Sequence, residues 1–339
     1  MTDAQWETLL AVIRGERVDP LPVGFIIDSP WLPNWAGMSI MDYFASESMW
    51  FEANVKAIRE FPEILFLPGF WSEFGMCTEP SAFGARCCWS ENEFPFADKC
   101  IADIGEAKSL ETPNPRTHGL LPMVLKRLLH CQDRVEAEGH RIRFAVARGP
   151  LNIASFMMGN TEFLMAVRTD PDDAKILLDK VTAFLIDWIA VQIEALPAID
   201  GVFLLDDLVG FLGLDDFQQF ALPYLKQIYQ AFDVSVKFFH NDARGLITAD
   251  HLSEIGVNLF NFSFEHSLEE IRQRTDNQVT LLGNIPPRDV LAAGTPDDVR
   301  QCAREMLAAV DTRRIILSCG GGMPPGVPTE NIQAVLDSR

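Results

Sequence analysis

The sequence lacks any apolar run long enough to cross a membrane. A spanning helix needs about 20 mostly apolar residues, and no stretch of the chain reaches roughly 18 without a charge. The opening residues, MTDAQWETLLAVIRGE, also lack the basic start and apolar centre of a secretory signal. The sequence therefore predicts a cytoplasmic protein that does not contact membranes.

Basic residues are also scarce. The chain has 48 acidic and 28 basic residues, which gives a formal net charge of −20. A surface this acidic repels the phosphates of nucleic acids and anionic lipids. We therefore expect no nucleic-acid partner.

Regularly spaced cysteines are absent as well. The seven cysteines are an odd number, they are irregularly spaced, and none forms a CxxC pair. This pattern favours a reducing compartment over a disulfide framework. Any cysteine chemistry is then expected to be thiolate chemistry.

What the sequence does contain is a series of apolar runs of strand length, separated in most cases by segments with helical periodicity. This alternation predicts an α/β fold with parallel strands. The number of runs predicts a single (β/α)8 TIM barrel over residues 1–339, with residues 70–141 as an insertion over the barrel mouth. A doubly wound sheet is the alternative, but no run is followed by GxGxxG. The runs are 22–28, 64–69, 142–149, 201–207, 234–242, 257–264, 279–285 and 314–321.

Polar side chains collect where these runs end, and in a barrel those ends surround one mouth. The candidates are Asp28, Pro68, Arg148, Asp206, Asp207, His240, Asp242, Glu265, Asn284 and Cys319. His240 and Asp242 are two residues apart, so both side chains of a strand can reach the same point. Together with Cys319, which precedes three glycines, they are possible zinc ligands. Some of these residues also have a purely structural interpretation. His240 could simply bond to a backbone carbonyl, and Cys319 could be a small buried hydrophobic residue. Asp206 and Asp207 could cap the helix that follows them.

Five aromatic residues follow the first two runs: Trp31, Trp35, Phe70, Trp71 and Phe74. If exposed, they would line the mouth for an apolar substrate. They could equally plug the top of the barrel.

Four segments, in this order, resemble the uroporphyrinogen decarboxylase superfamily. They are GPLNIASFMMG (149–159), DDLVGFLGLDDFQQFALPYLKQI (206–228), GNIPPRDVLAAGTPDDVRQCAREML (283–307) and IILSCGGGMPPGVPTENIQAVLDS (315–338). The resemblance implies a TIM barrel and one of two activities. The decarboxylases bind a polycarboxylate with arginines placed just after the first strand. The other branch consists of cobalamin-dependent methyltransferases with a zinc site written His-x-Cys and a distant Cys.

Two features of the sequence favour the methyltransferase branch. The segment after the first strand, DSPWLPNWAGMSIMDYF (28–44), contains neither arginine nor lysine, so a polyanion would be poorly bound. The zinc pattern falls on His240 and Cys319, with Asp242 where the family has its middle cysteine. A carboxylate makes the site harder and keeps more Lewis acidity on the metal, which suits polarising an ether or alcohol oxygen.

The leading hypothesis is thus a zinc-dependent methyltransferase that moves a methyl group between a small donor or acceptor, for example a methoxylated aromatic compound, and a corrinoid. No cobalamin module is recognised, because ADHLSEIG (249–256) matches DxHxxG only loosely, so a corrinoid partner protein is expected. A homodimer is possible.

This hypothesis assigns a role to each candidate residue. The metal ligands are His240, Asp242 and Cys319, with Glu265 as a fourth. The catalytic residues are Asp206, Asp207 and His240, and the substrate-binding residues are Trp31, Trp35, Phe70, Trp71, Arg148 and Asn284.

Two other readings stay open. One is a metal-free decarboxylase or lyase of a small carboxylic acid, anchored by Arg148 with Asp207 as acid and base. The other is a barrel that binds a ligand without catalysis.

Overall fold

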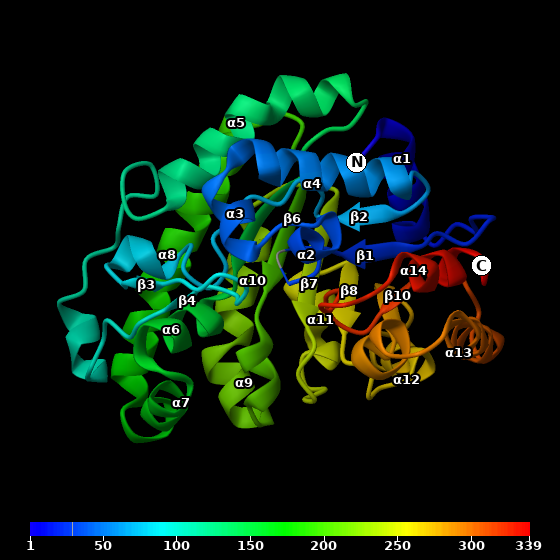
Figure 1. The fold of residues 1–339 in the computed structure, drawn as a ribbon. Helices are drawn as coiled ribbons and strands as arrows, with labels where there is room; N and C mark the ends of the chain where they lie inside the picture. Colours follow the sequence, from blue (N-terminus) through cyan, green and yellow to red (C-terminus); the bar gives the residue numbers. More distant parts are fainter. Residues whose placement is uncertain (29) are drawn as a thin grey trace.

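The computed structural model describes residues 1–28 and 30–339, and it is a TIM barrel of the predicted class (Figure 1). All eight predicted strands form, each inside its apolar run. Their bounds are β1 (Gly24–Ile26), β2 (Leu65–Leu67), β5 (Phe144–Arg148), β6 (Gly201–Leu205), β7 (Val236–Asn241), β8 (Leu259–Phe262), β9 (Thr280–Ile285) and β10 (Ile315–Cys319).

The strands are parallel and follow one another around the barrel in chain order. β5 to β10 form one six-stranded sheet, and β1 pairs with β2. A parallel bridge between Val23 and Leu317 joins the two groups, so β1 (blue) lies beside β10 (red) in Figure 1. Among the described residues no backbone ladder joins β2 to β5, and the barrel has a seam there.

A glutamine side chain from a helix takes the place of a strand at this seam. Gln192 in α8 accepts the Val146 N–H at 3.0 Å through Oε1 and donates to the Val146 carbonyl at 3.0 Å through Nε2. Both backbone groups at the edge of β5 are thus satisfied without a ladder partner.

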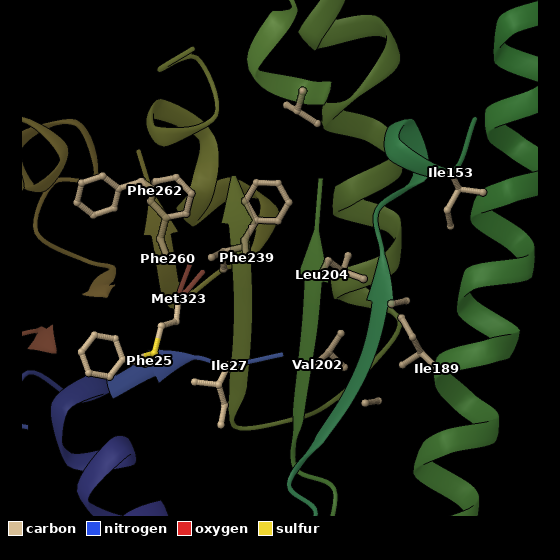
Figure 2. Packing of buried hydrophobic residues seen from close by; sticks show 14 of the residues in the cluster. Phe25, Ile27, Ile153, Ile189, Val202, Leu204, Phe239, Phe260, Phe262 and Met323 are labelled. Carbon is tan, nitrogen blue, oxygen red and sulfur yellow. The ribbon is translucent and has the colours of Figure 1, made fainter. Parts of the chain in front are cut away.

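The strands are buried on both faces, as strands of a parallel barrel are. Inside the barrel, Phe203 and Phe238 stack with ring centroids 4.1 Å apart. Outside, alternate residues such as Val202, Leu204 and Phe239 pack against helices, and Figure 2 shows Ile189 of α8 among them. This alternation decides which strand-end side chains face the mouth.

Helices surround the barrel, as the helical periodicity between the runs predicts. They form in the four segments where this periodicity is clearest, which are 49–61, 172–196, 214–232 and 295–310. The segment 214–232 divides into two helices because Pro223 lies at the start of the second. No helix of the described chain has both the length and the apolar character needed to cross a bilayer. The α-helices are α1 (Asp3–Ile13), α2 (Leu32–Ala36), α3 (Ile40–Ala45), α4 (Glu47–Glu60), α5 (Leu121–Ala137), α6 (Pro150–Met158), α7 (Asn160–Thr169), α8 (Pro171–Ala195), α9 (Leu214–Phe220), α10 (Leu222–Gln230), α11 (Leu252–Ile255), α12 (Leu268–Arg274), α13 (Pro296–Ala308) and α14 (Thr329–Leu336). The shorter turns are η1 (Pro80–Phe83), η2 (Ile104–Lys108), η3 (Asp207–Phe211), η4 (Ala249–His251) and the π-helical η5 (Pro287–Ala292).

Helix α1, which sequence patterns did not predict, closes the N-terminal end of the barrel. Trp6 packs edge-on against Phe144 at 5.5 Å, and the Val12 carbonyl accepts a hydrogen bond from Thr280 at 3.3 Å. Chemistry is therefore restricted to the opposite end, where the strands finish.

The segment predicted as an insertion over the mouth, 70–141, is not wholly an insertion, because it also contains the crossover helix between β2 and β5. Its hairpin of β3 (Cys87–Cys88) and β4 (Phe96–Ala97) and its turns pack along α6 and α8, and α5 is the crossover helix that leads to β5. Its first part reaches the mouth, where Glu73 and Glu79 contact Arg148.

The seam gives a first prediction. Gln192→Leu fills the same space but leaves the Val146 N–H and carbonyl without partners, which should lower the free energy of unfolding by about 2 kcal/mol. Gln219→Leu on the exposed side of α9 is the matched control and should change it by less than about 0.5 kcal/mol. Urea unfolding midpoints measure both, and equal effects would show that Gln192 does not hold the seam.

Candidate metal site at the barrel mouth

His240 lies at the end of β7 and points into the barrel, because it continues the inward series of Val236 and Phe238. The side chain is almost fully buried, at 6% exposure. Asp207, two residues after the end of β6, is oriented inward in the same way after Leu205.

A neighbouring asparagine fixes the tautomer of His240. Asn261 in β8 donates its amide hydrogens to the carbonyls of Leu282 at 2.8 Å and Cys319 at 3.2 Å. Its amide oxygen therefore faces the imidazole, 2.7 Å from Nδ1. Because that oxygen can only accept, Nδ1 carries the hydrogen and Nε2 of the neutral ring presents a lone pair.

The Nε2 lone pair faces two carboxylates. It lies 3.5 Å from Oδ1 of Asp207 and 4.0 Å from Oδ2 of Asp242. The three ligand atoms lie within 4.8 Å of one another. Either a proton on Nε2 or a bound cation would offset the charge of the two carboxylates.

The donor set fits a divalent metal ion. Zinc bonds of about 2.0–2.1 Å in tetrahedral geometry place ligand atoms about 3.4 Å apart, close to the observed separation of His240 and Asp207. Two carboxylates offset the charge of a divalent ion, and the Asn261 contact is the second hydrogen bond that metal-bound histidines commonly have. A fourth position stays open for substrate.

Two glycines shape the surroundings of Asp242. A Cβ at Gly321, whose φ is +95°, would lie 2.7 Å from the Asp242 carboxylate, and one at Gly320 would lie 2.5 Å from the backbone nitrogen of Phe264. The loop after β10 can therefore approach both residues closely. Beside Asp242 opens a pocket of about 350 Å³, lined by Asp242, Ser263, Phe264, Pro286, Pro287, Arg288, Asp289 and Gly320.

Arg148, predicted to anchor a substrate, is instead neutralised by carboxylates of the protein. Its guanidinium lies 2.7 Å from Glu73 and above the Trp71 ring, and the backbone N–H of Arg148 donates to the Glu79 carboxylate at 3.1 Å. Burial raises the pKa of Glu73 to about 8, with Asp28 and Glu79 adding to the rise and Arg148 opposing it. The sequence did not predict that Glu73 and Glu79 belong to the mouth. Their position in the segment after β2 was the only indication of it.

Three of the predicted catalytic or metal residues are engaged elsewhere. Asp206 is fully buried and accepts the N–H groups of Leu151 and Asn152 at the start of α6, so it is a helix cap rather than a catalytic group. Glu265 pairs with Arg244 at 2.7 Å.

Cys319 is the third. It follows the outward series of Ile315 and Leu317, so it packs among the residues that face the helices. Its thiol donates to the Gly321 carbonyl at 3.5 Å, and burial raises its pKa to about 12. The sulfur is not one of the three clustered ligand atoms.

The predicted substrate-binding aromatics pack into the protein interior. Trp31 and Phe70 are at most 2% exposed, so neither offers a substrate much surface. Trp35 stacks on Trp31 and donates to Thr329. Trp71 lies inside the barrel beside Phe203.

Asn284, the remaining predicted substrate contact, lies at the mouth. Its amide donates to the carbonyl of His266, a contact that holds the loop after β8.

A barrel with a histidine and two carboxylates at its open end defines a TIM-barrel enzyme. The family model "Uroporphyrinogen decarboxylase (URO-D)" matches residues 4–339, and the chain belongs to this enzyme family. The resemblance of the four sequence segments is thereby confirmed.

Curated relatives carry the same family name. The uroporphyrinogen decarboxylase of Thioalkalivibrio sulfidiphilus is 23% identical over 99% of this chain and 98% of that protein. That of Chloroherpeton thalassium is 30% identical over 49% of this chain and 48% of that protein.

Solved structures share the fold. A methyltransferase from Methanosarcina mazei matches with a TM-score of 0.81 at 19% identity, over 97% of this chain and 96% of that one. A B12-independent methionine synthase from Shewanella sp. W3-18-1 matches with a TM-score of 0.57 at 11% identity, over 94% and 96%.

The raised pKa of Glu73 predicts a pH dependence of stability. The folded protein keeps the Glu73 proton up to pH of about 8, whereas an ordinary glutamate releases it near 4.5. The folded state thus binds more protons in this window, and its free energy of unfolding falls as pH rises from 4.5 to 8. Glu73→Gln should remove this slope in urea unfolding, with Glu52→Gln on the exposed side of α4 as the surface-charge control. An unchanged slope in Glu73→Gln would contradict the assignment.

The Asn261 contact predicts the tautomer of His240. Imidazole nitrogen NMR of the metal-free protein, at a pH where the ring is neutral, should show the Nδ1–H form in the wild type and a mixture of tautomers in Asn261→Ala. Asn261→Asp keeps an acceptor and should restore the Nδ1–H form. A wild-type Nε2–H form would refute this reading of the site.

Proposed function

We propose that this protein is a zinc-dependent methyltransferase that moves a methyl group between a small donor and a corrinoid carried on a partner protein. The observation that carries the proposal is the cluster of three ligand atoms, Nε2 of His240 and one carboxylate oxygen each of Asp207 and Asp242, beside an open pocket. When bound, zinc supplies Lewis acidity that polarises a donor oxygen and eases departure of its methyl group.

The chain's own residues prepare this chemistry. Asp207, His240 and Asp242 would hold the ion, and Asn261 keeps the imidazole lone pair directed at it. Carboxylate oxygens are harder ligands than thiolates and leave the metal more electrophilic. The set therefore suits an ether or alcohol donor, such as a methoxylated aromatic.

Exposed apolar side chains support a protein partner. Met165 in α7, Phe211 in η3 and Leu214 in α9 are 59%, 68% and 50% exposed, and all belong to segments that follow β5 or β6. Large exposed apolar residues are typical of protein interfaces. A corrinoid protein that docks at this end would bring its cofactor to the donor.

Decarboxylation is the second candidate, because the curated relatives carry that name. The geometry supports it less well. A polycarboxylate needs several cations, yet Arg148 is already paired with Glu73 inside the protein.

The proposal predicts the ligands of the metal. Zinc-reconstituted wild-type protein should retain about one equivalent after dialysis, and Asp207→Asn, His240→Ala and Asp242→Asn should each lower the zinc affinity by about 10-fold or more. Glu265→Gln and Cys319→Ser serve as rim and thiol controls and should retain zinc. Elemental analysis together with competition against a chelator measures each affinity. Zinc loss in Cys319→Ser but not in Asp207→Asn would overturn the ligand set, and full activity without metal would overturn the zinc proposal.

A further inference from the structure

The pocket beside Asp242 is assembled from the ends of four strands. Asp242 follows β7, Ser263 and Phe264 follow β8, Pro286 to Asp289 follow β9, and Gly320 follows β10. Its volume of about 350 Å³ lies in the range of small-molecule sites. Because Asp242 belongs to both the pocket and the ligand cluster, a molecule in the pocket lies next to the proposed metal.

Arg288 is the cation of this pocket, and its charge is available. Arg148 is paired with Glu73 and Arg244 with Glu265. Arg288, by contrast, is exposed, and within residues 1–28 and 30–339 its guanidinium has neither an ion pair nor a hydrogen bond with another side chain. Asp289 is its chain neighbour on η5, and adjacent residues on a helical turn point in different directions.

Part of the pocket lining is apolar. The Phe264 side chain is 42% exposed, and Pro286 and Pro287 add apolar surface. The close approach of Gly320 to the Phe264 backbone holds this part of the lining in place. A flat apolar ring can lie against these residues while a polar group reaches Arg288.

The charges of the pocket limit how many carboxylates a ligand can carry. Asp242 and Asp289 are the acidic groups that line it. A divalent ion bound at the ligand cluster would offset Asp242, but Asp289 would still repel a second anionic group. One carboxylate matches one arginine, in a geometry that a guanidinium binds bidentately.

We infer that this pocket binds the substrate as a monoanion, with its single carboxylate on Arg288 and its apolar ring on Phe264 and Pro286. The inference rests on the proposed function and adds the class of substrate: an aromatic acid whose ether oxygen points toward the metal cluster. Arg288 is the residue that selects the charged substrate over a neutral one of the same shape.

Calorimetric titration of the zinc-loaded protein tests the inference with two probes of nearly equal shape, 3-methoxybenzoate and 3-methoxybenzyl alcohol. The wild type should bind the benzoate about 10-fold or more tightly than the alcohol. Arg288→Gln should abolish this preference and leave the alcohol affinity unchanged. Asp289→Asn, the matched control in the same pocket, should bind the benzoate at least as tightly as the wild type.

Three results would overturn the inference: equal wild-type affinities for the two probes, no binding of either probe, or an Arg288→Gln variant that keeps the preference. Thermal unfolding of each variant confirms that the exposed substitutions leave the fold intact.

The titration contains no corrinoid, so its outcome is separate from that of the proposed function. Arg288-dependent binding without methyl transfer to added cob(I)alamin would refute the methyltransferase proposal alone. Methyl transfer that is indifferent to Arg288 would refute the substrate class alone.

Discussion

The hydrogen bond between Nδ1 of His240 and Oδ1 of Asn261 is the contact on which the candidate site depends. Two carbonyl acceptors, on Leu282 and Cys319, hold the asparagine amide so that its oxygen faces the imidazole. The histidine is thereby left with a lone pair directed at two carboxylates. Three neighbouring strands of the barrel supply the acceptors and the asparagine, so the orientation is a property of the fold rather than of a mobile loop.

Charge is distributed unevenly around the mouth. Arg148, Glu73 and Glu79 form a buried group that balances itself, and burial keeps a proton on Glu73 near neutral pH. The candidate metal cluster, by contrast, holds two carboxylates beside one histidine, and a bound cation would balance them. The mouth therefore contains a buried ionic group and, beside it, a group of side chains that can take a ligand.

Much of the fold was predictable because parallel strands buried on both faces appear as continuous apolar runs. The same property hid which of two adjacent residues faces the mouth. Asp207 rather than Asp206 points inward, and Cys319 points outward, because the inward series of β6 and β10 includes Leu205 and Ile316. Because polar and apolar residues do not alternate along these strands, the sequence does not show which residues face the inside of the barrel. His240 and Asp242 could be predicted as a pair because residues i and i+2 of a strand point to the same side, whichever side faces the inside of the barrel.

The central claim is that nitrogen and oxygen ligands, without sulfur, hold a divalent ion at this mouth. X-ray absorption spectroscopy of the zinc-loaded protein tests it most directly, since zinc–sulfur bonds of about 2.3 Å are distinct from zinc–nitrogen and zinc–oxygen bonds of about 2.0–2.1 Å. The account predicts a first shell of light atoms at the shorter distance only, with one imidazole. A sulfur shell contributed by Cys319 would contradict it.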